Sequence, residues 1–168
     1  MPDISRFHGM IVLIHIVGVV LFVLAHSVSA VVVLRMRSER NPAALRAMLD
    51  LSRRSLTVAG IGFLLWFLGG ILAGFSGNWW TTGRLWVWAS LIIAIVLTGL
   101  MTPMGRFYLN RVREAVGVDP KTGKYDPAVQ VDGAAVEAAI ASGQPVVLAG
   151  IGIVGLLVIL WLMVAKPF

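Results

Sequence analysis

The sequence contains four long stretches made almost entirely of apolar residues. They cover about residues 9–34, 56–75, 85–104 and 146–165, each close to the ~20 residues that an α-helix needs to cross about 30 Å of hydrocarbon. A chain of 168 residues that is 58% hydrophobic and 13% charged is too apolar for an ordinary soluble domain. We therefore predict an all-α polytopic membrane protein, a four-transmembrane-helix bundle that forms one integral membrane domain over residues 1–168.

The basic residues are distributed unevenly between the connections. Eleven of the 14 lysines and arginines lie in the connections at 35–55 and 105–145. The other three are Arg6, Arg84 and Lys166, on the opposite side of the predicted membrane. Connections rich in Lys and Arg stay in the cytoplasm. We therefore predict that both large connections are cytoplasmic and that both termini lie outside.

The formal net charge of +6 follows from the same distribution. The positive charges gather beside the predicted membrane, where they would meet anionic lipid headgroups. We therefore expect membrane lipids as partners, and no nucleic acid.

Cap and turn residues predict short structures within the two cytoplasmic connections. Asn41-Pro42 favours a helix start, because Asn accepts hydrogen bonds from free N–H groups and Pro suits the first helical position. The second helix is predicted to begin there as a cytoplasmic stem. Gly117 is predicted to end an extension of the third helix, and Asp132 to cap a short helix over 133–142.

All three histidines lie in or beside the first apolar stretch. At about 100° per residue, His8, His15 and His26 fall within about 20° of one another on a helix, with Gly18 and Ser29 close to them. Polar side chains at membrane depth face the inside of a bundle, because exposure to hydrocarbon is costly. We predict that this histidine stripe faces inward. The opposite side is apolar and suits lipid: Leu13, Val17, Val20, Leu21, Leu24, Val28 and Val31.

The stripe is a candidate cofactor site. His15 and His26 are about 16.5 Å apart along the helix axis, one in each leaflet, as two haem b ligands would be. The other predicted helices contain no histidine, so this chain alone cannot give one haem two histidine ligands. The sixth ligand would have to be Met101, Met163 or a residue of another subunit.

Two other interpretations remain open. Copper is one, because His8 and Met10 lie near the outer boundary and Cu(I) accepts imidazole and thioether ligands. The other is structural: each histidine forms a hydrogen bond with a carbonyl, Ser or Thr of a neighbouring helix, where Ser90, Thr98 and Thr102 are available. Proton transfer is disfavoured because no Asp or Glu lies within a predicted span.

Small residues indicate close helix packing. Gly70 and Gly74 form a GxxxG pattern, and Ser90, Ala94 and Thr98 recur every fourth position on the third helix. Both rows suit contacts within the bundle or at a subunit interface. In addition, "VAGIGFLL" and "LAGIGIVG" share Ala-Gly-Ile-Gly on the second and fourth helices, which leaves a duplication of two-helix units open.

Three stretches resemble bacterial four-helix integral membrane proteins of unknown function related to the copper-resistance CopD group. They are "LIHIVGVVLFVLAHSVSAVVVL" with the Arg-rich turn after it, "LTVAGIGFLLWFLGGILAG" and "WVWASLIIAIVLTGLMTPMGRF". His15, Gly18 and the tryptophans at the start of the third helix carry the resemblance, which covers helices one to three. It implies the bacterial plasma (inner) membrane and a link to copper or haem.

The chain carries no paired nucleophile and base, and no phosphate-binding loop. We therefore expect no catalysis by this chain alone. The expected function is that of a non-catalytic integral membrane subunit within or beside a larger membrane complex of the respiratory or photosynthetic type. The alternative is a haem- or copper-handling membrane protein that uses the histidine stripe.

Overall fold

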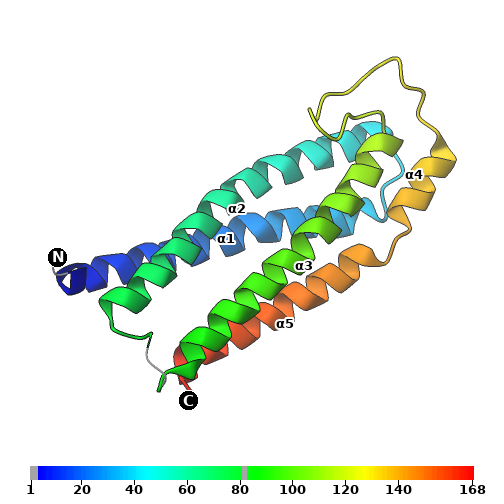
Figure 1. Ribbon diagram of the computed structural model, residues 1–168. Coiled ribbons are helices and arrows are strands. Elements are labelled where there is room, and N and C mark those ends of the chain that lie inside the picture. The colour runs from blue at the N-terminus through cyan, green and yellow to red at the C-terminus, as the bar shows by residue number, and fades with distance from the viewer. Residues whose placement is uncertain (1–3, 81–82) are drawn as a thin grey trace.

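The computed structural model describes residues 4–80 and 83–168. The helices in these ranges are η1 (Ile4–Phe7), α1 (His8–Met36), α2 (Pro42–Ser76), α3 (Leu85–Ala115), α4 (Gly133–Ile140) and α5 (Gln144–Ala165). Four helical segments there are long and apolar enough to cross a membrane, and no β-strand forms in the described part (Figure 1). The predicted all-α, four-helix membrane bundle is confirmed.

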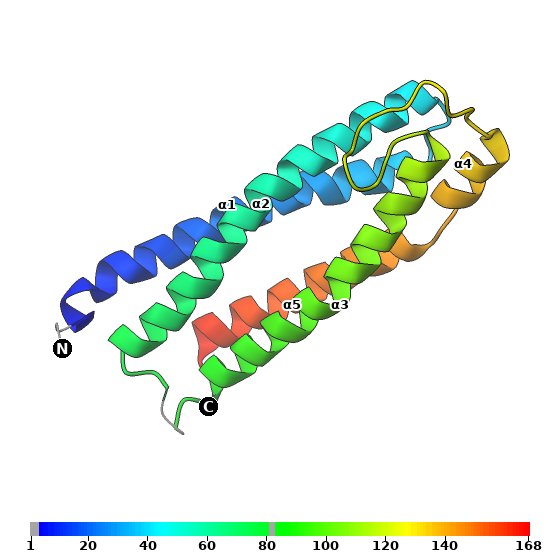
Figure 2. The ribbon, with the colours of Figure 1, turned by 45° about the horizontal axis from the view of Figure 1, so that its top comes forward.

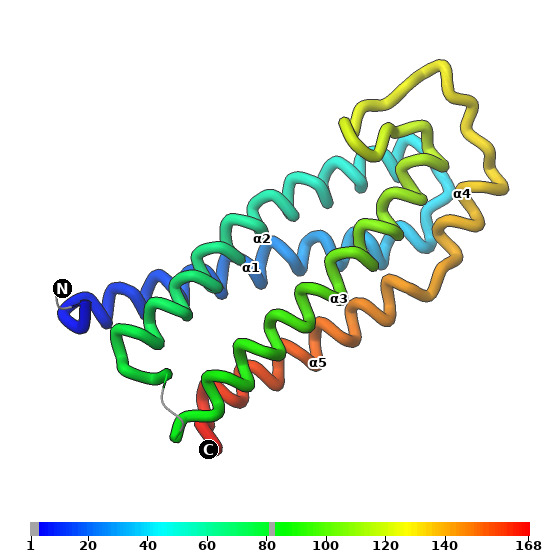
Figure 3. The backbone as a smooth tube through the Cα atoms, in the orientation of Figure 1, coloured from blue at the N-terminus to red at the C-terminus, as the bar shows by residue number. Residues whose placement is uncertain are grey.

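The long helices form two antiparallel pairs. α1 packs along α2, and α3 packs along α5, whereas contacts between the two pairs are sparse (Figure 2). Both chain ends and the α2–α3 connection lie at one end of the bundle, here called the terminal end (Figure 3). The α1–α2 turn, the loop after α3 and α4 lie at the other end, here called the α4 end.

Glycines let α1 and α2 approach each other closely. A Cβ atom at Gly62 of α2 would lie 2.5 Å from the backbone nitrogen of Phe22 of α1. The backbone of α2 likewise leaves no space for a Cβ atom at Gly18 of α1. Nearer the α4 end, the hydroxyls of Ser29 and Ser52 share a hydrogen bond of 2.6 Å between the helices. Backbone proximity of this kind increases van der Waals contact, which drives helix association in lipid.

α3 and α5 also meet across glycines, but with side chains filling the space. A Cβ at Gly152 of α5 would lie 3.1 Å from the terminal methyl carbon of Met101, and Gly155 lies under the side chain of Leu97. Long apolar side chains of α3 therefore fill the notches that glycines leave in α5.

The two pairs are joined at the terminal end through aromatic rings. The ring of Trp79, in the α2–α3 connection, lies edge-on to His8 of α1 with centroids 5.1 Å apart, and 5.8 Å from the ring of Trp86 of α3. Trp86 is buried with Val87 and Leu162 of α5 in a small cluster. Trp79 thus links α1 to the α3–α5 pair.

At the α4 end, α2 extends beyond the thickness of a bilayer. Its 35 residues span about 52 Å, against about 30 Å of hydrocarbon. The predicted start is confirmed, since the Asn41 side chain accepts a hydrogen bond from the backbone N–H of Ala43 at 2.9 Å. This stem helps to enclose the main core, whose buried members are Val32, Met36, Leu45, Leu49, Tyr108, Leu109, Val112, Val116, Val118, Val136, Ala139 and Ile140.

The loop after α3 is held against the stem of α2 by arginines. The Arg46 Nε donates to the carbonyl oxygen of Val116 at 2.9 Å, and its guanidinium lies 3.7 Å from the ring centroid of Tyr125. Arg53 donates through Nη1 to the carbonyl oxygen of Thr122 at 3.0 Å. Two of the basic residues on which the predicted membrane orientation rests therefore also hold the loop after α3.

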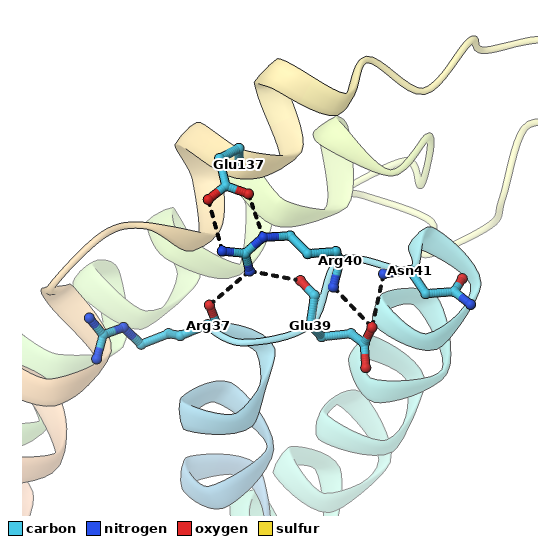
Figure 4. A network of polar contacts seen from close by, with 5 residues as sticks. All are labelled: Arg37, Glu39, Arg40, Asn41 and Glu137. Atoms are coloured by element: carbon cyan, nitrogen blue, oxygen red, sulfur yellow. Dashed lines mark hydrogen bonds and ion pairs between the residues drawn. The ribbon is translucent and has the colours of Figure 1, made fainter.

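Arg40 ties α4 to the α1–α2 turn (Figure 4). It forms an ion pair with Glu137 of α4, with Nη2 to Oε1 at 2.8 Å, and its Nη1 donates to the carbonyl oxygen of Arg37 at 3.1 Å. The Glu39 carboxylate accepts the backbone N–H groups of Asn41 and Arg40, both at 2.9 Å. These two hydrogen bonds hold the pKa of Glu39 below its ordinary value.

The predicted helix ends in this region agree closely with the structure. α3 ends at Ala115, and Gly117 has the positive φ of 73° that glycine adopts without strain. Asp132 caps α4 by accepting the backbone N–H of Ala134 at 2.9 Å. α4 ends at Ile140, two residues before the predicted end of the 133–142 helix.

Candidate functional site

The histidine stripe faces α2. The ring nitrogen Nδ1 of His15 lies 2.8 Å from the carbonyl oxygen of Trp66. A carbonyl can only accept a hydrogen bond, so Nδ1 donates it, and Nε2 is the ring nitrogen that this contact does not use. This is the arrangement by which proteins orient a metal-binding imidazole, and it also satisfies a purely structural histidine.

Glycines of α2 make the space in which the His15 ring lies. A Cβ atom at Gly70 would lie 3.0 Å from both Cε1 and Nδ1 of the ring. A Cβ at Gly69 would lie 3.1 Å from the Cα of His15. Gly70, one of the predicted packing residues, therefore accommodates an imidazole ring of the neighbouring helix.

His8 is held at the terminal end of the same stripe. Its Nδ1 lies 2.8 Å from the hydroxyl oxygen of Ser76 at the end of α2, and its ring touches Trp79. Two of the three histidines thus form hydrogen bonds with α2.

His26 belongs to a group of five rings. It stacks on Phe22 with centroids 5.2 Å apart and planes 13° apart, and Phe22 stacks in turn on Trp66 at 5.6 Å and 22°. Phe63 and Phe67 complete the group, which we call the aromatic cluster. All five residues are half-buried, and His26 makes no hydrogen bond to any of the described residues.

The side chains of α3 that were suggested as histidine partners lie elsewhere. Ser90 is buried, and its hydroxyl donates to the carbonyl oxygen of Trp86 in its own helix at 2.7 Å. The observed histidine partners, Trp66 and Ser76, both belong to α2. α1 and α2 pack so closely that the neighbouring chain segment, and not α3, is within hydrogen-bonding distance.

The inward direction of the stripe is confirmed by the exposure of the opposite side of α1. Leu21 is half-buried. The other residues predicted to face lipid are exposed: Leu13, Val17, Val20, Leu24, Val28 and Val31.

The residues present do not complete a six-coordinate haem within one chain. Met101 packs on Gly152 of α5, and Met163 packs beside the cluster around Trp86, so both suggested sixth ligands contribute to the packing of α3 and α5. His15 could supply one axial ligand through Nε2. With Met101 and Met163 engaged in packing, the remaining expectation for a second ligand is a residue of another subunit.

The structure does not gather a copper site from His8 and Met10. Two positions apart on a helix, they point to nearly opposite sides, and Met10 is 59% exposed while His8 faces α2. Over residues 4–80 and 83–168, no group of three or more His, Asp or Glu side chains could hold a metal ion.

The remaining predicted packing residues are found in two settings. Gly74 lies under the indole ring of Trp80 and not against another helix, since an added Cβ would be 2.5 Å from that ring. Ser90 and Ala94 are buried in α3, and Thr98 is half-buried. The GxxxG pattern alone did not indicate Gly18, Gly62 and Gly69, where the helix backbones meet. The seven-residue spacing of Gly62 and Gly69 was the available signal.

The fold and this site together define a multi-pass, all-α membrane protein with a half-buried histidine stripe between its first two helices. Comparisons of the chain with protein-family models, with curated proteins and with solved structures found no match.

Proposed function

We propose that this chain is a non-catalytic integral membrane subunit that packs within or beside a larger membrane complex of the respiratory or photosynthetic type. The observation that carries the proposal is the weak packing between its two helix pairs. Each pair is closely packed through its own glycines, whereas contacts between the pairs are sparse. The aromatic cluster on α1 and α2 is only half-buried. A transmembrane helix of another subunit, or of a second copy, would complete its burial.

We place the protein in the bacterial plasma membrane with the α4 end in the cytoplasm. The eleven basic residues of the two larger connections support this orientation, because they gather at that end. The sequence resemblance supports the bacterial location.

Site-specific photo-crosslinking in native membranes tests the subunit proposal. A photoreactive phenylalanine analogue at Phe67, in the aromatic cluster, should give a discrete protein adduct. The same analogue at Val31, which is 66% exposed on the side of α1 away from the stripe, is the matched control and should give lipid adducts. Lipid adducts alone at Phe67, or the same protein adduct at both positions, would refute the proposal.

The second candidate function is haem or copper handling, favoured by the His15 geometry. The hydrogen bond to Trp66 fixes the proton on Nδ1 and leaves Nε2 available to a metal. Because residues 4–80 and 83–168 hold no metal-binding group of three side chains, such a centre would be shared with a partner. An absorption spectrum and a metal analysis of the protein isolated with its partner test this candidate. A colourless, metal-free complex would exclude it.

A further inference from the structure

The aromatic cluster contains two polar groups, the imidazole of His26 and the indole N–H of Trp66. Phe22 stacks on both rings, with centroid distances of 5.2 Å to His26 and 5.6 Å to Trp66. The other two members, Phe63 and Phe67, contribute only hydrocarbon, and their ring centroids lie 5.3 Å and 6.4 Å from that of Trp66. These ring contacts place both polar groups in one continuous surface formed by α1 and α2.

Neither polar group has a hydrogen-bond acceptor in the part of the chain that the structure describes. A neutral imidazole carries one N–H, and an indole N–H can only donate. The Trp66 backbone carbonyl accepts the hydrogen bond of His15, but the Trp66 side chain takes no part in that contact. His26 and Trp66 therefore hold at least two donors that no described residue satisfies.

Both donors lie at hydrocarbon depth. Trp66 is at the centre of the apolar run at 56–75, and His26 lies eight residues, about 12 Å, from the end of the run at 9–34. Lipid tails offer no acceptor there, and the ester oxygens of lipids lie at the membrane surface. An unsatisfied N–H in hydrocarbon is costly, so a segment that covers the cluster gains by providing an acceptor.

The size of the rings determines which kind of acceptor can reach the donors. His15 reaches a backbone carbonyl because α1 and α2 approach closely, and a Cβ at Gly69 would lie 3.1 Å from the Cα of His15. A helix that docks on the aromatic cluster would instead meet large rings, which hold its backbone away. The acceptor is therefore expected to be a side-chain oxygen that projects from the docked helix.

The lipid-facing sides of α3 and α5 do not offer such an oxygen at this depth. Their exposed side chains near the middle of the membrane are aliphatic, among them Ile92, Ile95, Val96, Ile153, Val154 and Leu157. A second copy of the chain that docked through α3 or α5 would thus leave His26 and Trp66 unsatisfied. This favours a different protein as the occupant.

We propose that the aromatic cluster docks a transmembrane helix of another subunit, and that this helix presents a side-chain oxygen to His26 and Trp66. The inference rests on the proposed subunit function and specifies the partner. The partner helix carries a hydroxyl, amide or carboxyl group within its membrane span. Polar pairs of this kind hold helices together in lipid in addition to close packing. The rings supply contact area, and the two donors select the partner.

The test measures how strongly the partner is held. The photoreactive analogue at Phe67 is activated after membranes are dissolved in increasing amounts of a neutral detergent, which dilutes associating helices. His26→Phe keeps a planar ring and removes the polar atoms. The detergent concentration that halves the protein adduct should therefore fall by about three-fold. His26→Gln retains an N–H and should fall less, whereas purely apolar docking would give the opposite order and overturn the proposal.

Trp66→Phe should weaken the adduct in the same direction. Trp88→Phe is the matched control, because it removes an indole N–H from α3, where Trp88 contacts Trp80 outside the cluster. Its adduct should resist detergent as the wild type does.

Unfolding of the purified chain gives a second readout. Without a partner, His26→Phe should unfold at the same temperature as the wild type or higher, because it removes an unsatisfied donor. A clear loss of stability would show that the chain itself satisfies His26 and would overturn the proposal.

The remaining outcomes separate this inference from the proposed function. A protein adduct that resists detergent equally in the wild type and in His26→Phe would overturn the polar contact and leave the subunit proposal standing. The absence of any protein adduct at Phe67 in the wild type would overturn both. A small-molecule adduct, or an adduct of twice the chain mass, would identify a membrane-soluble compound or a second copy as the occupant and would also overturn the inference.

Discussion

At the residue scale, the hydrogen bond of His15 explains why a histidine can lie in a segment that suits lipid. Its Nδ1 proton is accepted by Trp66, and Gly70 leaves room for the ring. The imidazole is thereby kept from hydrocarbon on one side. The other nitrogen, Nε2, takes no part in this hydrogen bond, and its use would separate a ligand role from a structural role.

Substitution of His15 distinguishes these two roles. His15→Gln should retain a donor for the Trp66 carbonyl, whereas His15→Leu should remove the side-chain hydrogen bond that this carbonyl accepts in addition to its helical one, at a cost of about 0.5–1.5 kcal/mol in unfolding free energy. If His15 is structural, the free energy of unfolding in detergent should therefore fall more for His15→Leu than for His15→Gln. If His15 binds a metal or haem, both substitutions should remove it, since an amide replaces imidazole poorly there.

The sequence predicts the direction of the histidines but not their partners. Helical periodicity alone places His8, His15 and His26 on one side of α1. It contains no information on the register between α1 and α2. Ser90 has a suitable hydroxyl, but its own helix satisfies that hydroxyl, and a backbone carbonyl such as that of Trp66 leaves no signature in the sequence.

At the element scale, the shared Ala-Gly-Ile-Gly motif turns its second glycine toward the partner helix in both pairs. The second glycine of each motif, Gly62 or Gly152, faces the partner helix, at Phe22 or Met101. The first glycine, Gly60 or Gly150, has no neighbouring atom within 4 Å. Gly62 meets the backbone of its partner helix, whereas Gly152 meets the end of a methionine side chain, so the duplication of two-helix units stays a hypothesis.

The two glycines of one motif provide a matched pair of substitutions. Gly62→Leu should separate α1 from α2 and lower the free energy of unfolding by about 1–3 kcal/mol, because its side chain has no space. Gly60→Leu adds the same atoms facing open space and should be tolerated. Unfolding of both variants in the same detergent measures the difference. Equal losses of stability would show that the helices do not meet at Gly62.

The GxxxG pattern of Gly70 and Gly74 does not mark the place where the backbones of α1 and α2 meet. Gly62, which lies outside that pattern, does. Gly70 accommodates the His15 ring, and Gly74 accommodates the Trp80 ring. Both glycines are needed for aromatic or imidazole neighbours. A pattern of small residues predicts that space is needed, but it does not predict whether a backbone or a ring fills that space.

At the scale of the whole molecule, the four apolar runs are enough to predict the four-helix fold. They do not predict how the segments at the α4 end contact one another. The stem start at Asn41 and the cap at Asp132 were predictable because their chemistry is local. The contacts of Arg46 with Val116 and of Arg40 with Glu137 join residues far apart in the sequence. No periodicity encodes such pairs.

The orientation can be measured directly because the chain contains no cysteine. A single cysteine at Ser38, in the α1–α2 turn, should react with a membrane-impermeant maleimide only after the membrane is permeabilised. A single cysteine at Gly83, which is exposed at the terminal end, should react in intact cells. The reverse pattern of labelling would place the α4 end outside and contradict the charge-based prediction.

The close packing of α1 and α2 has a consequence for biosynthesis. Their contacts join neighbouring segments of chain, so this hairpin can close as soon as α2 has entered the membrane. α3, by contrast, must wait for the loop and α4 to be synthesised before α5 can reach it. During that interval, the side chains of Met101 and Leu97, which later fill the notches at Gly152 and Gly155, lack the helix that covers them. The α1–α2 hairpin is thus already present in the membrane when α3 and α5 pair, and they can assemble against its surface.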